Sequence, residues 1–296
     1  MRTLVPVLQH RVWGGQYLAQ VFPDAQAKPP VGEAWLLSDH PTARTLDEQG
    51  RALSEMVPDR PWFPVLIKIL HAVTDLSVQV HPNDEQAKAI GDLGKTEGWL
   101  ILSATPGARI CYGHHAQSPE QLREAAASGT LDTWLRYTEV SAGQYFPVPA
   151  GTVHALGGGI VALEVQQASD TTYRLYDYHR KDTNGELRAL HVDEGIAVTA
   201  FPQPPLPEQG ARVPHDGLIE YENHAYYGVA TADVDGAFTH AAVPDRLLCV
   251  VLLDGEVAPT SFPRRPTPFQ TWVFEEGEAV SLRGTGRVAI VQIPLH

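Results

Sequence analysis

Short strand-like runs with apolar and polar residues in alternation recur along the chain. The clearest are residues 76–81 (LSVQVH), 99–102 (WLIL), 161–166 (VALEVQ) and 288–293 (VAIVQI). A period of two is typical of a strand that buries one face. The chain also holds 25 Gly and 24 Pro, spread along its length as frequent turns between short strands require. The pattern predicts a mainly β fold, a sandwich or a barrel.

Helical signals are concentrated between about residues 83 and 137. The clearest is at 118–129, where Ser118, Pro119 and Gln121 stand at N-cap, N1 and N3 and Gly129 ends the segment. A short helix is predicted after Asn83, and another over Val192–Thr199. The Pro-rich stretch 201–210 reads as a linker. We therefore expect a larger domain over 1–205, with a helical insert at about 83–137, and a smaller β-sandwich over 211–296.

Composition narrows the class of protein further. The 296 residues are 43% hydrophobic and 19% charged, which is ordinary for a globular chain, and the net charge is −13. That charge argues against nucleic acid and anionic membrane as partners, so an anionic ligand would need a local basic pocket. Two cysteines are too few for a disulfide framework, and the N-terminus has no sustained apolar run. We expect a cytoplasmic protein, a monomer or small homo-oligomer.

One face of the run 76–81 carries Ser77, Gln79 and His81. A strand buried on its other side could simply expose these residues to water. Residues 143–154 (GQYFPVPAGTVH) form a second, turn-rich segment that ends in one histidine. This segment resembles the second motif of the cupin superfamily, whose histidine joins ligands from an earlier strand pair to bind a divalent metal inside a jelly-roll barrel.

Longer motifs narrow the resemblance. They are 12–15 (VWGG), 32–35 (GEAW), 63–84, 94–97 (GKTE), 149–156 (PAGTVHAL) and 167–180 (QASDTTYRLYDYHR). In this order, over about residues 5–200, they resemble the type I mannose-6-phosphate isomerases in their short bacterial form. The resemblance implies a cupin barrel with a second, cupin-like β-sandwich, and one zinc ion per chain held by Gln79, His81, Glu97 and His154. Such oxygen and nitrogen donors suit zinc.

The same resemblance implies roles for residues around the metal. It makes Arg174 catalytic and places substrate-binding residues at Ser77, Lys68, Lys95, Trp13, Glu164 and Asp170. Taken alone, Lys68 in an apolar run is typical of a snorkelling side chain, and Arg174 of a surface ion pair. Lys95 shares strand parity with Glu97, so its ammonium is expected in the same cavity. The remaining histidines show no ligand spacing.

The implied activity is a zinc-dependent isomerase that interconverts mannose 6-phosphate and fructose 6-phosphate through an enediol. Glu164, Lys95 and a zinc-bound water each remain candidates for proton transfer. Two alternatives stay open at this point. One is another metal-dependent cupin enzyme, such as an oxygenase, because a shared barrel does not fix the chemistry. The other is a non-catalytic module that binds a sugar phosphate.

Overall fold

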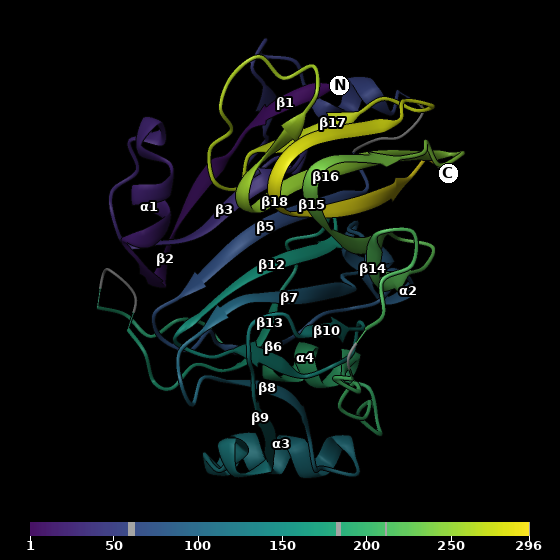
Figure 1. Ribbon diagram of the computed structural model, residues 1–296. Helices are drawn as coiled ribbons and strands as arrows, with labels where there is room; N and C mark the ends of the chain where they lie inside the picture. Colours follow the sequence, from purple (N-terminus) through teal and green to yellow (C-terminus); the bar gives the residue numbers. More distant parts are fainter. Residues whose placement is uncertain (59–62, 182–184, 211, 296) are drawn as a thin grey trace. The chain divides into compact units, whose positions relative to one another are not determined.

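The computed structural model describes residues 1–295 apart from 59–62, 182–184 and 211 (Figure 1). The chain divides into two compact units. The first comprises Met1–Val7, Trp35–Lys68 and Gly210–His296, and the second comprises Leu8–Ala34 and Ile69–Gln209. The first unit thus combines the expected C-terminal domain with two segments from the N-terminal quarter. The predicted domain boundary between 205 and 211 stays a prediction. Residues 211 and 296, the two ends of the expected second domain, lie outside the described residues.

The first unit is built on one seven-stranded antiparallel sheet. Its strand order is β14, β15, β18, β16, β17, β1, β4, with bounds Leu218–Asn223, Gly228–His240, Val280–Pro294, Arg246–Pro259, Thr271–Phe274, Arg2–Val5 and Leu46–Asp47. Three of these strands run for 13 to 15 residues. Glycines at positive φ, such as Gly236 and Gly255, interrupt the side-chain pattern of these long strands. The core of this unit centres on Trp272, Val250 and Ile290.

Two further sheets contain the strands of the second unit, and two strands of the first of these sheets, β3 and β5, are divided between the two units. One has the order β10, β7, β12, β5, β3, β2, with bounds Tyr145–Val148, Glu97–Ala104, Ile160–Gln167, Val65–Ala72, Val31–Leu37 and Val7–Gly15. The other has the order β13, β6, β11, β8, β9, with bounds Tyr173–Tyr176, Val78–Val80, His154–Leu156, Arg109–His114 and Leu135–Glu139. Both sheets contribute side chains to one apolar core that includes Trp99, Phe146 and Tyr112. They therefore pack face to face.

Four α-helices lie in the described chain: α1 Tyr17–Val21, α2 Asp84–Ala87, α3 Pro119–Ser128 and α4 Val192–Val198. Short 3-10 turns cover Pro23–Ala25, Leu53–Met56, Lys88–Ile90 and Leu131–Trp134. Leu122 of α3 and Ile196 of α4 pack with Val78 and Leu175 on the outer face of the five-stranded sheet. Helices α3 and α4 thus cover the side of that sheet that faces away from the core shared with the six-stranded sheet (Figure 1). None of the described helices is long and apolar enough to cross a membrane.

The predicted helices are present at the expected places. Ser118 caps α3 by accepting a hydrogen bond from the Gln121 amide, and Gly129 ends the helix at φ 72°. The Gln121 side chain accepts from the Gln117 amide instead of completing a reciprocal pair with Ser118. All four predicted strands are found, although only Val78–Val80 of the run 76–81 is paired as strand. The mainly β prediction is confirmed.

Candidate active site and metal centre

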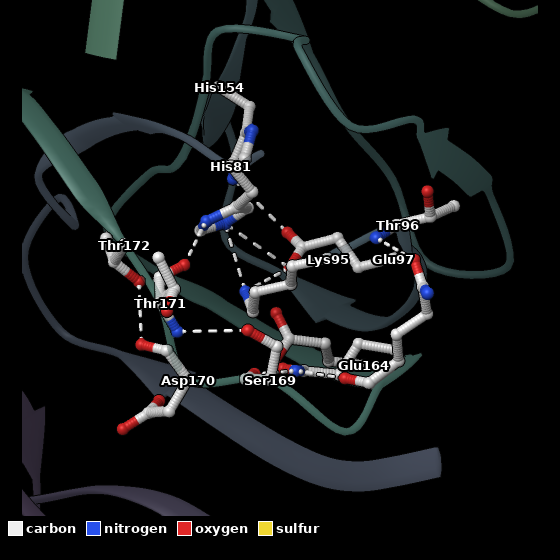
Figure 2. Close-up of polar contacts among 12 residues, drawn as sticks. His81, Lys95, Thr96, Glu97, His154, Glu164, Ser169, Asp170, Thr171 and Thr172 are labelled. Carbon is white, nitrogen blue, oxygen red and sulfur yellow. Dashed lines mark hydrogen bonds and ion pairs between the residues drawn. The ribbon is translucent and has the colours of Figure 1, made fainter. Parts of the chain in front are cut away.

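Three buried side chains from three different strand ends converge in the second unit (Figure 2). His81 follows β6, Glu97 begins β7 and His154 begins β11. Their ligand atoms all lie within 4.8 Å of one another, and none of the three residues is more than 1% exposed. The carboxylate of Glu97 lies near the Nε2 atoms of both rings: its Oε2 is 3.6 Å from His81 Nε2 and its Oε1 is 3.2 Å from His154 Nε2. The sequence had predicted these three residues as part of one metal site.

Strand register explains why these side chains share one face of the five-stranded sheet. Gln79 lies directly opposite His154 on one side and opposite Arg174 on the other, and His154 in turn lies opposite Tyr112. Directly opposite residues of an antiparallel pair project to the same face. Arg174, Gln79, His154 and Tyr112 therefore form a row across β13, β6, β11 and β8. This row faces the core, whereas Val78 and Val80 point to the helices.

The turn before β11 sets the position of His154. Gly151 has φ +85°, a conformation that L side chains rarely adopt, and a Cβ there would lie 3.1 Å from the Val198 carbonyl. Its amide donates to the carbonyl of His81 at 2.9 Å, and the Thr152 amide donates to the Pro149 carbonyl. The tight turn thus ties the segment that carries His154 directly to the backbone of His81.

Backbone carbonyls fix the orientation of both imidazoles. Nδ1 of His81 lies 2.9 Å from the Thr171 carbonyl, and Nδ1 of His154 lies 2.8 Å from the Thr152 carbonyl. A carbonyl only accepts, so in each neutral ring Nδ1 carries the proton and Nε2 presents a lone pair to the cluster. Burial, and then the neighbouring Lys95 ammonium, hold the pKa of His81 well below its ordinary value. His81 is therefore neutral near pH 7, as a metal ligand must be.

The arrangement fits a divalent metal. His154 Nε2 and Glu97 Oε1 lie 3.2 Å apart, and neither atom has a hydrogen-bond partner among the described residues. Two acceptors that face each other at this distance repel unless a cation lies between them. A tetrahedral zinc ion with bonds of 2.0–2.2 Å separates its ligand atoms by about 3.3–3.6 Å, close to the 3.2 and 3.6 Å observed. The three side chains could thus hold a metal.

Lys95 enters the same cluster, as its parity with Glu97 had suggested. Its side chain is 4% exposed, and its ammonium donates to Glu97 Oε2 and lies 3.0 Å from His81 Nε2 (Figure 2). Burial alone would raise the pKa of Glu97, but the Lys95 ammonium beside the carboxylate holds that pKa well below its ordinary value. Glu97 is therefore a carboxylate despite its burial.

Glu164 and Asp170 take different places. Glu164 lies opposite Trp99 in strand register, is buried, and accepts a hydrogen bond at 3.0 Å from the Trp99 indole. The Trp99 ring in turn packs T-shaped against the ring of His154, with 5.3 Å between ring centroids. The carboxylate of Asp170, in contrast, points away from the three clustered side chains in Figure 2. Of these two carboxylates, Glu164 is the one connected to the cluster.

Ser77 and Trp13 are buried in the second unit, Ser77 just before β6 and Trp13 in the core shared by its two sheets. Lys68 belongs to the first unit, on β5, and is buried with its ammonium 5.0 Å from the centre of the Trp35 ring. A cation over a tryptophan face is favourable. This contact replaces the snorkelling arrangement that Lys68 suggested when taken alone. The roles of all three residues toward substrate stay predictions.

Arg174 is half-buried and belongs to a small cationic group. It donates through Nη1 to the Ala189 carbonyl at 2.8 Å, and its Nε has no hydrogen-bond partner among the described residues. Burial, and then nearby Arg188, lower its pKa from the ordinary value. Asp177 accepts from Arg180 at 2.7 Å and from Arg188 at 2.6 Å. Two arginines share the carboxylate of Asp177 and Arg174 lies near them, so this part of the acidic chain is locally positive.

Sequence reasoning missed the groups that position His81. The Thr171 carbonyl holds the His81 ring, and Asp92 Oδ2 accepts hydrogen bonds from the hydroxyls of both Thr171 and Ser169. Ser169 also accepts from the Thr171 amide through its hydroxyl. A carbonyl has no residue-specific signature, so only the aspartate and the hydroxyls of this loop could have been noticed.

The chain is similar to known proteins in its sequence and in its fold. Residues 1–126 match the family model "Phosphomannose isomerase type I, catalytic domain". The chain is 45% identical to mannose-6-phosphate isomerase ManA of Bacillus subtilis over 217 residues, and this match covers 68% of each chain. It is 42% identical over 211 residues to mannose-6-phosphate isomerase of Streptococcus mutans, 67% of each chain. A crystal structure of the Bacillus subtilis mannose 6-phosphate isomerase superposes with a TM-score of 0.86 at 29% identity, over 99% of both chains.

Proposed function

The chain belongs to the type I phosphomannose isomerases, and from that premise we propose that it interconverts mannose 6-phosphate and fructose 6-phosphate with one zinc ion. The cupin fold expected from the sequence accords with this family and with the solved structure it resembles. The observation that carries the proposal is the buried cluster of His81, Glu97 and His154. Both imidazoles turn their lone pairs toward one carboxylate there, which is how a metal-binding site is arranged.

The proposed ligands are the three clustered side chains and Gln79. Gln79 is supported by its position opposite His154, which sends its side chain to the same face of the sheet. Two imidazoles, one carboxylate and one amide oxygen form a donor set that suits zinc. When bound there, zinc supplies a Lewis acid that polarises oxygens of the open-chain sugar.

The reaction must remove a proton from the carbon next to the sugar carbonyl and return one to the neighbouring carbon, with an enediol between the two steps. We assign the proton transfer to Glu164. Its carboxylate is buried and held by the Trp99 indole, whose ring contacts His154. A carboxylate fixed in this way is positioned for general base and then general acid catalysis. Lys95 is the second candidate, and Glu164→Gln against Lys95→Gln in a single-turnover assay separates the two.

The positive charges of Arg174, Arg180 and Arg188 can balance the negative charges of the substrate. The guanidinium of Arg174 can stabilise the oxyanion that develops as the enediolate forms, because Arg174 lies directly opposite Gln79, a proposed metal ligand, in the strand register. Ser77 and the neighbouring basic side chains bind the sugar phosphate. Trp13, Lys68 and Asp170 remain proposed pocket residues on the strength of the resemblance alone.

The test is a coupled assay with mannose 6-phosphate, combined with elemental analysis of the purified protein. We expect turnover, close to one zinc per chain, and loss of both in His154→Ala. His115→Ala is the matched control, since His115 is exposed and outside the cluster. Turnover in the wild type would exclude a module that only binds sugar phosphate. No turnover in metal-replete protein would refute the isomerase assignment, and full zinc in both His81→Ala and His154→Ala would refute the site.

A further inference from the structure

A cavity in the first unit gathers positive charge. Its volume is about 360 Å³, within the roughly 300–1,000 Å³ typical of small-molecule sites. Its lining comes from β16, from β18 and from the segment that follows β16, and consists of Glu256, Ala258, Phe262, Arg264, Arg265, Pro266, Arg283 and Gly284. All of these residues belong to the first unit, so the cavity shares none with the cluster of His81, Glu97 and His154.

The wall formed by residues 260–268 has a restrained backbone. Three of these residues are prolines, at positions 263, 266 and 268, and each proline fixes its own φ. Phe262 is buried and packs T-shaped on Trp272 of β17, with 5.3 Å between ring centroids. The Thr260 amide donates to the Ser281 carbonyl of β18 at 2.9 Å. The backbone of this wall is therefore held in place without any ligand.

Three guanidinium groups and one carboxylate line the cavity. Arg283 makes no hydrogen bond or ion pair with any residue that the structure describes. Arg264 pairs with Glu48 and Arg265 with Glu256, and both arginine side chains are more than half exposed. Exposed ion pairs contribute little free energy, so these two guanidinium groups can exchange their partners for a ligand. The cavity is thus locally positive in a chain whose net charge is −13.

We propose that this cavity binds a phosphorylated small molecule, with its phosphate on Arg283 and the two neighbouring guanidinium groups. Arg283 lies directly opposite Ala258 in the register of β16 and β18, which run side by side (Figure 1). Directly opposite residues project to the same face, so the Arg283 side chain extends beside a residue that fills little space. Glu256 stands two positions before Ala258 and projects to that face as well. Its carboxylate can accept hydrogen bonds from ligand hydroxyls once Arg265 turns to the phosphate.

The charge and shape of a phosphate ester match this lining. The planar guanidinium fork binds phosphate through two parallel hydrogen bonds. A phosphate monoester carries about −1.5 to −2 charges at pH 7 and three acceptor oxygens, so it can engage more than one arginine at once. A carboxylate has one charge and two oxygens, and it would satisfy the group less completely. The site is independent of the proposed isomerase activity, whose residues lie in other parts of the chain.

The test is an NMR titration of the ¹⁵N-labelled full chain with fructose 1,6-bisphosphate, followed through the backbone amides of Ala258 and Gly284. We expect these amides to shift with the bisphosphate and not with fructose. In Arg283→Gln the dissociation constant should rise roughly tenfold or more, because a charge-assisted hydrogen bond is lost. Higher salt should weaken binding, since the guanidinium groups are exposed. Arg283 is exposed and unpaired among the described residues, so the variant should keep the wild-type melting temperature.

Arg287→Gln is the matched control. Arg287 lies on the same strand, is exposed and pairs with Asp233 outside the cavity, so its loss removes the same charge and should leave the dissociation constant unchanged. An equal weakening in both variants would show a general effect of charge and overturn the site. Shifts confined to the second unit would place the bisphosphate elsewhere and also overturn it. Absence of turnover with mannose 6-phosphate, in contrast, would refute the proposed function and leave the cavity's binding unaffected.

Discussion

Asp92 offers a sharp test of how the loop after β12 positions His81, a proposed metal ligand, because Asp92 acts on His81 through two other residues. Its carboxylate accepts hydrogen bonds from the Ser169 and Thr171 hydroxyls, and the Thr171 carbonyl holds Nδ1 of His81 at 2.9 Å. Asp92→Ala removes the acceptor and leaves every proposed ligand in place. Thr171 is then free to shift, and with it the ring of His81.

The expected magnitude follows from these contacts. A hydrogen bond to a charged group contributes about 1.5–3 kcal/mol, so the loss of two should lower the free energy of unfolding by about 2–4 kcal/mol, allowing for their shared acceptor. Loss of a group that orients a metal-bound histidine typically reduces metal affinity by about 10- to 100-fold. The two effects share one cause, so they should appear together.

The assay is chelator competition for Zn²⁺, run beside urea unfolding of the metal-free protein. Asp132→Ala is the matched control, because Asp132 is exposed on a 3-10 turn outside this network. Asp92→Asn should lie between the wild type and Asp92→Ala, since it keeps the size of the side chain and one acceptor. Wild-type metal affinity in a folded Asp92→Ala protein would refute the claim that this loop holds His81.

Three further predictions concern catalysis, mechanism and pH. Arg174→Ala should lower kcat by about 10²–10³ with zinc retained, and Arg174→Lys should recover part of it; near-native kcat with full zinc would remove Arg174 from the mechanism. Reaction in heavy water should place deuterium at C1 or C2 of the product, as NMR can detect, whereas quantitative retention of the migrating hydrogen would weaken the enediol path. Burial, and then nearby Arg136, lower the pKa of His114 from 6.5 to about 4. The folded state therefore binds fewer protons than the unfolded state between these pH values, and the free energy of unfolding should fall as the pH drops from about 6.5 to about 4. The slope is at most about 1.4 kcal/mol per pH unit, and solvent screening reduces it. His114→Asn should flatten the unfolding free energy over that window, and an unchanged slope would contradict the assignment.

The alternation of side chains was the part of the site most open to prediction. A period of two placed Gln79 and His81 on one face, and the chain follows it, with Val78 and Val80 on the opposite, apolar face. The turn 149–154 was predictable because proline and glycine have restricted or unusual backbone angles. Both are local properties, and the sequence carries them directly.

Groups that act across distant segments were not predictable in the same way. His81 and Thr171 are 90 residues apart, and their contact involves a backbone carbonyl that any residue could supply. The same limit applies to Lys68, whose position over Trp35 depends on the pairing of strands. The strand predicted over 288–293 was too short, because Gly284 and Gly286 at positive φ let β18 continue past positions that usually end a strand.

The row formed by Arg174, Gln79, His154 and Tyr112 has a consequence for insertions and deletions. Adding or removing a single residue within β6 would turn Gln79 toward α3 and α4 and bring an apolar side chain to the centre of the row. A change of two residues would restore the same facing, although it would shift the row along the strand. Length variation compatible with activity should therefore be confined to the connecting loops, while the strands of the five-stranded sheet tolerate substitution better than any change in residue count.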